Sequence, residues 1–150
     1  MSRYEIESIG NIIMVKNLIF KNTITNKKEI DYAWELGRPC IIIYSDNEYD
    51  YFLTITTSQA SEKFEYRYFK MENNDFMYLI KNKNNKNKIN KVSRYINLKN
   101  IYKMPICGHE VVNKITFLKY REVITKLKKY HDDKKLIDIV KTATDVRKRK

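Results

Sequence analysis

An arginine and a pair of hydroxyl residues stand at the ends of two predicted neighbouring strands. Arg38 lies at the start of the apolar run 37–44, and Thr57 and Ser58 close the next apolar run, 50–58. The residues between the two runs are turn-forming types, so the pattern predicts a hairpin. Because the start of one antiparallel strand lies beside the end of the next, we expect Arg38 to lie near the two hydroxyls.

These residue types suit the cleavage of RNA by internal transfer. RNA carries its own nucleophile, the 2′-hydroxyl, so the reaction needs a proton acceptor, a cation for the phosphorane and a donor for the leaving 5′-oxygen. The planar guanidinium of Arg38 matches phosphate oxygens, and Thr57 and Ser58 can hold the phosphate and the 2′-oxygen in line. Hydroxyls at strand ends are common, so the spacing alone does not establish this chemistry.

The charge of the chain points to a polyanionic partner. Its 150 residues contain 30 Lys and Arg against 18 Asp and Glu, a net charge of +12. Such a surplus attracts nucleic acid, and abundant aromatic residues add stacking surfaces. A composition rich in Lys, Asn and Ile is the plainer explanation. The length predicts one domain, 1–150.

Several other functions lack support in the sequence. The two cysteines, Cys40 and Cys107, have no metal-ligand or disulfide-framework spacing, and Cys40 is expected to be buried. Phosphate-loop, dinucleotide-binding and nucleophile-elbow motifs are missing, so we expect no metal and no cofactor. No apolar run is long enough for a membrane span and no secretory leader is recognisable, so a cytoplasmic protein is expected.

The remaining pattern predicts strands followed by helices, an α+β order. Further strands are expected at 10–15, 92–98 and 101–106, and a second hairpin is expected from 64–71 and 76–80. Apolar residues at helical spacing predict a helix over 117–131, after which Asp132 and Asp133 are expected to cap a second helix.

The order of these motifs resembles the MazF/Kid family of toxin endoribonucleases. The resemblance rests on the glycine-led run 10–15, a long basic loop, the Arg-Pro pair at 38–39 and the Thr-Ser pair at 57–58. The segment 96–106 and the two C-terminal helices resemble the type III toxin–antitoxin branch of that fold, the ToxN/CptN proteins. The resemblance covers most of the chain.

The resemblance implies a fold, an activity and a partner. The fold would be a compact SH3-like (MazF/Kid-like) antiparallel β-barrel with C-terminal helices, forming a single toxin endoribonuclease domain. The activity would be metal-independent, sequence-selective cleavage of mRNA that leaves a 2′,3′-cyclic phosphate. The partner would be a small pseudoknotted non-coding RNA antitoxin, which the toxin cuts from its precursor and which then blocks the active site in an RNA–protein hetero-oligomer.

The resemblance also implies site residues. Arg38, Thr57 and Ser58 fall on the catalytic positions, but Gln59 and Ala60 replace the Pro and Lys that often follow the pair. A general base is not identified; Lys16 or a tyrosine could serve. The cationic residues expected to bind RNA are Lys16, Lys21, Lys27, Lys28, Lys63, Lys81, Lys83, Lys86 and Lys88.

Two other interpretations stay open. One is a non-catalytic, basic barrel that binds nucleic acid through phosphate contacts and base stacking. The other is a MazF-like RNase with a protein antitoxin.

Overall fold

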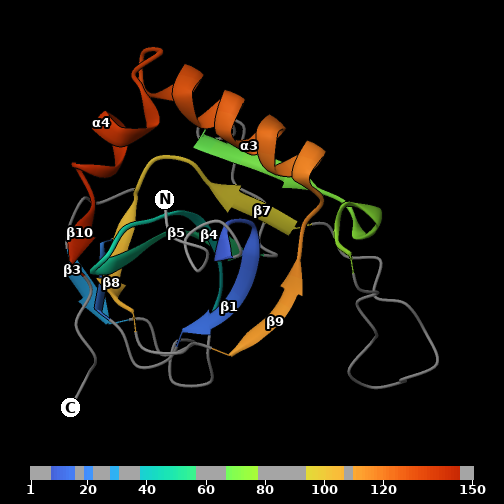
Figure 1. Cartoon of the computed structure of the whole chain (residues 1–150), viewed down its shortest axis with the longest axis horizontal. Coiled ribbons are helices and arrows are strands. Elements are labelled where there is room, and N and C mark those ends of the chain that lie inside the picture. Colours follow the sequence, from blue (N-terminus) through green and yellow to red (C-terminus); the bar gives the residue numbers. More distant parts are fainter. Residues whose placement is uncertain are drawn as a thin grey trace.

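The structure, a computed structural model, describes residues 8–15, 19–21, 28–30, 38–56, 67–77, 94–106 and 110–145. Within these ranges the chain forms a mostly antiparallel eight-stranded sheet, a separate two-stranded sheet and two α-helices (Figure 1). Among these described residues, no helix is both long and apolar enough to cross a membrane.

The large sheet is built around a central hairpin. Its strand order is β10-β8-β5-β4-β1-β9, and β7 pairs with both β5 and β6. Every pairing is antiparallel except that of β10 with β8. The strands are β1 (Asn11–Val15), β4 (Arg38–Ser45), β5 (Tyr49–Thr56), β6 (Tyr68–Met71), β7 (Arg94–Asn97), β8 (Tyr102–Pro105), β9 (Val111–Lys114) and β10 (Thr144–Asp145).

The predicted β4–β5 hairpin is confirmed, and its turn has a local cause. The Asp46 carboxylate accepts hydrogen bonds from the backbone N–H groups of Glu48 at 2.8 Å and Tyr49 at 2.7 Å. This is the side-chain-to-backbone bonding by which Asp favours turns. The Tyr51 hydroxyl donates to the same carboxylate at 2.8 Å. The turn thus fixes the register of the two longest strands.

The hairpin is apolar on both faces because it separates two core clusters. Ile41, Ile43 and Leu53 belong to the larger cluster, which also holds the buried residues of the C-terminal helices. Cys40, Ile42 and Phe52 belong to a smaller cluster, with side chains from β1 and β8. A strand buried on both sides reads as a continuous hydrophobic run, and the prediction that Cys40 is buried is confirmed.

The helix predicted over 117–131 is confirmed as α3 (Phe117–Tyr130). It begins where the Thr116 hydroxyl accepts the N–H of Lys119, and it buries Val123, Ile124 and Leu127. Figure 1 shows α3 lying along one side of the sheet, beside the strand β6. The second helix, α4 (Leu136–Val140), is short.

The prediction that Asp132 and Asp133 cap the second helix is wrong. Both residues have a positive φ, 59° and 58°, and the N–H of Asp133 bonds to the carbonyl of Lys128 at 2.8 Å. That bond is the six-to-one closure of a helix C-terminus, so the two aspartates end α3. Lys135 takes the N-cap position of α4, without a side-chain cap.

The second predicted hairpin, 64–71 with 76–80, is not formed by its described residues, and its residues 64–66 and 78–80 lie outside the described ranges. β6 pairs with β7, and Phe76 forms an isolated bridge with Ile115. A short 3-10 helix, η2 (Asn73–Asp75), occupies the expected turn.

The strands expected at 10–15, 92–98 and 101–106 are confirmed as β1, β7 and β8, whereas β9 and β10 were not expected. The remaining pair, β2 (Ile19–Lys21) with β3 (Lys28–Ile30), lies in the long basic segment.

Candidate phosphate-binding site at the end of β5

The predicted approach of Arg38 to the end of β5 follows from the strand register. Cys40 pairs with Thr54 across the β4–β5 ladder, so extending this register by two residues brings Arg38 opposite Thr56. Thr56 is the last residue of β5, immediately before Thr57 and Ser58. Those two catalytic candidates themselves lie outside the described residues.

A tyrosine lies on the other side of the same strand end. Tyr95 of β7 pairs directly with Thr56, and Ile96 pairs with Ile55. Directly opposite residues of an antiparallel pair share one face, with Cβ atoms about 4.5–5.5 Å apart. Arg38, Thr56 and Tyr95 therefore form a row across three strands. Because neighbouring strands are about 4.8 Å apart, the backbones that carry the guanidinium, the hydroxyl and the phenol lie within about 10 Å.

This row is accessible on one face only. Along β5, Leu53 and Ile55 are buried against the larger cluster, whereas Thr54 and Thr56 on the opposite face are half-buried. Arg38 and Tyr95 are also half-buried. A ligand can therefore approach these side chains from the Arg38 face of the strand end.

The positive charge of Arg38 affects the pKa of the nearby Cys40 thiol. Burial raises the pKa of the Cys40 thiol, and the positive charge of Arg38 opposes part of that rise. The thiol donates a hydrogen bond to the Arg38 carbonyl at 3.5 Å. Since a nucleophilic cysteine must be a thiolate, Cys40 is a packing residue here.

A second arginine and a cavity lie on the opposite face. Arg94, the first residue of β7, lines a cavity of about 280 Å³ together with Pro39 and Ile55, and Asn113 and Phe76 complete much of its wall. Burial lowers the pKa of Arg94. The volume is near the lower end of the roughly 300–1,000 Å³ typical of small-molecule sites.

Tyr95 and Arg94 were missed as site residues in the sequence. The strand that carries them was predicted, but nothing in the sequence tells which strand it pairs with. Of the predicted RNA-binding lysines, Lys21 and Lys28 stand opposite each other in the β2–β3 pair. The others, whose positions are not described, are Lys16, Lys27, Lys63, Lys81, Lys83, Lys86 and Lys88.

A scan of the sequence against family models found no match. Searches of curated proteins and of solved structures likewise returned no match.

Proposed function

We propose that the protein is a metal-independent endoribonuclease whose cleavage site lies at the end of β5. The supporting observation is the row of Arg38, Thr56 and Tyr95, since it sets a cation and a phenol on either side of the strand that leads into Thr57 and Ser58. These groups match what internal transfer by the 2′-hydroxyl requires.

The residues take separate roles in this proposal. The Arg38 guanidinium stabilises the phosphorane, and the Thr57 and Ser58 hydroxyls hold the phosphate and the 2′-oxygen in line. The sequence left the proton-transfer role to Lys16 or a tyrosine, and in this proposal Tyr95 takes it. The 2′-oxygen forms its bond to phosphorus as the bond from phosphorus to the 5′-oxygen breaks, and Tyr95 passes the proton of the 2′-hydroxyl on to the leaving 5′-oxygen. The product is a 2′,3′-cyclic phosphate with a free 5′-hydroxyl on the leaving strand.

Sequence selectivity has a candidate source in the Arg94 cavity. The cavity lies on the face opposite Arg38, so a flat base of an RNA that passes around the strand end would pack against Phe76 and Ile55. Arg94 and Asn113 would supply polar contacts to the edge of the base. Arginine reads base edges by paired hydrogen bonds, so this cavity would favour one base over others.

The biological setting is proposed from the resemblance and the charge. The protein would be the toxin of a type III toxin–antitoxin system that cuts mRNA and arrests growth, and its inhibitor would be a small pseudoknotted RNA that it processes. The fold would be an SH3-like barrel. The split pairing of β5 supports this curvature, because its first half pairs with β8 and its second half with β7.

The test is an end-mapped digest of a defined single-stranded RNA by the purified protein in EDTA. We expect specific cuts that leave 2′,3′-cyclic phosphate ends, and an Arg38→Ala loss of about 10²–10³-fold in rate. The matched control is Arg121→Ala, which removes an exposed arginine of α3. Cleavage that disappears in EDTA, or an Arg38→Ala variant as active as Arg121→Ala, would refute the mechanism.

A non-catalytic RNA-binding protein is the second candidate. It is favoured by a separate groove lined by lysines and tyrosines, which needs no reaction to be useful. This alternative predicts salt-dependent RNA binding without any cut in the same digest.

A further inference from the structure

A second hollow lies between β6 and α3, away from the cavity beside Arg94. It has a volume of about 760 Å³. We call it the α3 groove and define it by its described lining residues: Tyr68, Phe69, Lys70, Leu98, Lys126, Lys129 and Tyr130. Three of these are lysines and none is acidic, so the groove carries a local positive charge.

Two of the three groove lysines lie on the same face of α3. Lys126 and Lys129 are three residues apart, so they share one face of α3, and both are exposed. No ion pair joins either of them to another residue in the described ranges. Lys70 makes one pair with Glu72 at 3.5 Å, but both side chains are more than half exposed. Such a pair is weak and easily exchanged for another anion.

The aromatic walls of the α3 groove are held in place. The Tyr130 ring meets His131 edge-on at 5.0 Å between centroids, and the His131 Nε2 lies 2.8 Å from the Leu98 carbonyl oxygen. This contact ties the end of α3 to the sheet. The groove therefore exists before any ligand binds, which lowers the entropy cost of binding.

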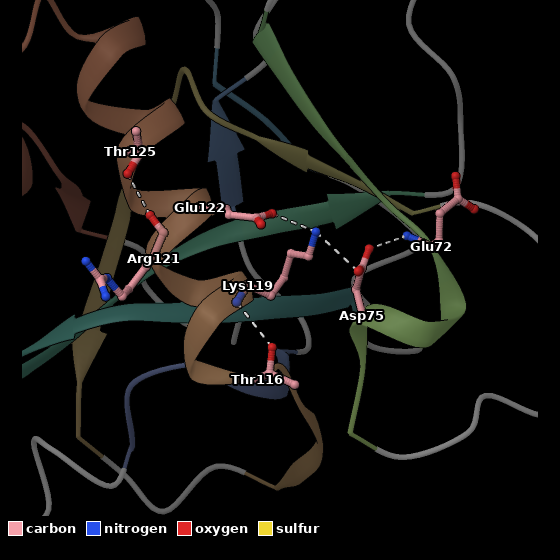
Figure 2. A network of polar contacts seen from close by, with 7 residues as sticks. All are labelled: Glu72, Asp75, Thr116, Lys119, Arg121, Glu122 and Thr125. Atoms are coloured by element: carbon pink, nitrogen blue, oxygen red, sulfur yellow. Dashed lines mark hydrogen bonds and ion pairs between the residues drawn. The ribbon is translucent and has the colours of Figure 1, made fainter.

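The other end of α3 is fixed by an ion-pair network (Figure 2). Lys119 lies 3.2 Å from the carboxylate of Asp75 and 2.7 Å from that of Glu122. The Asp75 side chain in turn accepts the N–H of Glu72 at 2.8 Å. Because Asp75 belongs to η2, which follows β6, the network joins both walls of the groove.

Lys70 lies between the candidate cleavage site and the α3 groove. Lys70 pairs with Tyr95 across β6–β7, and Tyr95 pairs with Thr56 across β7–β5. Neighbouring strands are about 4.8 Å apart, so Lys70 lies about 10 Å from the end of β5. Helix α3 packs on the opposite face of the sheet, together with Ile55 and Ile96. An RNA strand leaving the cleavage site over Tyr95 would therefore meet Lys70 next and pass around β6 to reach the lysines of α3.

From this arrangement we propose that the α3 groove binds the single-stranded flank of the substrate RNA. The lysines contact phosphates, and the Tyr68 and Tyr130 rings stack on bases. A duplex would keep its bases stacked inside, so the tyrosines select a single strand. This inference rests on the proposed function, since it names where the substrate extends beyond the cleaved bond.

The experiment measures binding of a fluorescent 2′-O-methyl RNA, which lacks the nucleophile and so reports binding without cleavage. For Lys126→Ala/Lys129→Ala we expect the salt slope to fall by about 1.4 and the affinity at 0.1 M salt to fall about 25-fold. The matched control is Lys134→Ala/Lys135→Ala, which removes the same charge from an exposed turn outside the groove. Equal losses in both variants would overturn the proposal.

Stacking has its own test at Tyr68. Tyr68→Ala should weaken binding about 5- to 150-fold, and Tyr68→Phe, which keeps the ring, should restore it. Equal affinity for a duplex of the same length would overturn the single-strand assignment. A groove variant that loses affinity for a pseudoknotted RNA but not for the linear RNA would overturn the assignment to substrate.

Cleavage of unmodified RNA separates the groove from the proposed function. With a short RNA that ends near the cut, the groove variant should match the wild type, whereas with a long RNA its KM should rise about 25-fold. Wild-type protein that binds through the groove but never cuts would refute the proposed function alone. A cutting enzyme indifferent to the groove lysines would refute the groove alone.

Discussion

Tyr95→Phe is the most informative substitution at the candidate cleavage site. It removes a single oxygen from the residue that pairs with Thr56 at the end of β5. If the phenol transfers a proton in the transition state, its loss should lower kcat by about 10²–10⁴-fold. That range corresponds to about 2.7–5.4 kcal/mol of transition-state stabilisation.

The structure predicts a far smaller effect of Tyr95→Phe on folding. The side chain is half-buried, and no hydrogen bond joins its hydroxyl to another residue within the described ranges. Substitutions of this kind change the free energy of unfolding by about 0.5 kcal/mol or less. An inactive variant would therefore still be folded, and the two effects differ by several kcal/mol.

The assay is single-turnover cleavage of a defined RNA across a pH series, with thermal unfolding of each protein as a check. Tyr44→Phe is the matched control, because it makes the same change near the other end of β4. We expect Tyr95→Phe to lose rate at every pH of the series, whereas Tyr44→Phe keeps the wild-type rate. If Tyr95→Phe cuts within about threefold of the control while Arg38→Ala is inactive, proton transfer by Tyr95 is refuted.

Two further predictions concern what holds the site in place. The Tyr120 hydroxyl donates to the Ile43 carbonyl at 2.6 Å. Tyr120→Phe should leave that acceptor unpaired and lower the free energy of unfolding, measured in urea, by about 1–3 kcal/mol. An unchanged urea midpoint would show that the bond does not anchor α3. At the β4–β5 turn, burial alone would raise the pKa of Asp46, but hydrogen bonds from Tyr49, Glu48 and Tyr51 outweigh it and hold the pKa below its usual value. Ionised Asp46 therefore stabilises the fold above about pH 4, and this contribution is lost as the pH falls through the lowered pKa. Asp46→Asn should be less stable than the wild type at pH 7 by about 1 kcal/mol, and the gap should narrow as the pH falls below about 4. Asp138→Asn, which changes an exposed carboxylate, is the control. A gap that stays constant as the pH falls would contradict the assignment.

The sequence predicted local elements well and long-range pairing poorly. The β4–β5 hairpin could be read because an apolar run, a turn rich in polar residues and a second apolar run follow one another directly. Helix α3 could be read because its buried residues repeat with the helical period. Both elements are decided by contacts between residues that are close in sequence.

The two failures have different causes. β6 was expected to pair with the segment just after it, yet it pairs with β7, which lies more than twenty residues further on. Asp132 and Asp133 have the composition of a cap, but their positive φ and the bond to Lys128 make them a helix end. For β6 a long-range strand pairing decided the outcome, whereas for the two aspartates the sequence permits both an end of the preceding helix and a cap of the following one.

The same distinction explains why Arg38 was identified as a site residue and Tyr95 was not. Arg38 reaches the end of β5 through a hairpin, so its position follows from the local sequence. Tyr95 reaches the same point only because β7 joins the other edge of β5 after a long intervening segment.

The two core clusters make this strand end the suitable place for chemistry, because they bury the middle of the hairpin on both faces. Beyond Leu53 the smaller cluster no longer covers Thr54 and Thr56 fully, so polar groups become accessible while the backbone stays held by β4 and β7. Cleavage at a phosphate requires both access for the RNA and fixed positions for the groups around the phosphate. In the described part of the chain, the Arg38 face of this strand end combines the two properties.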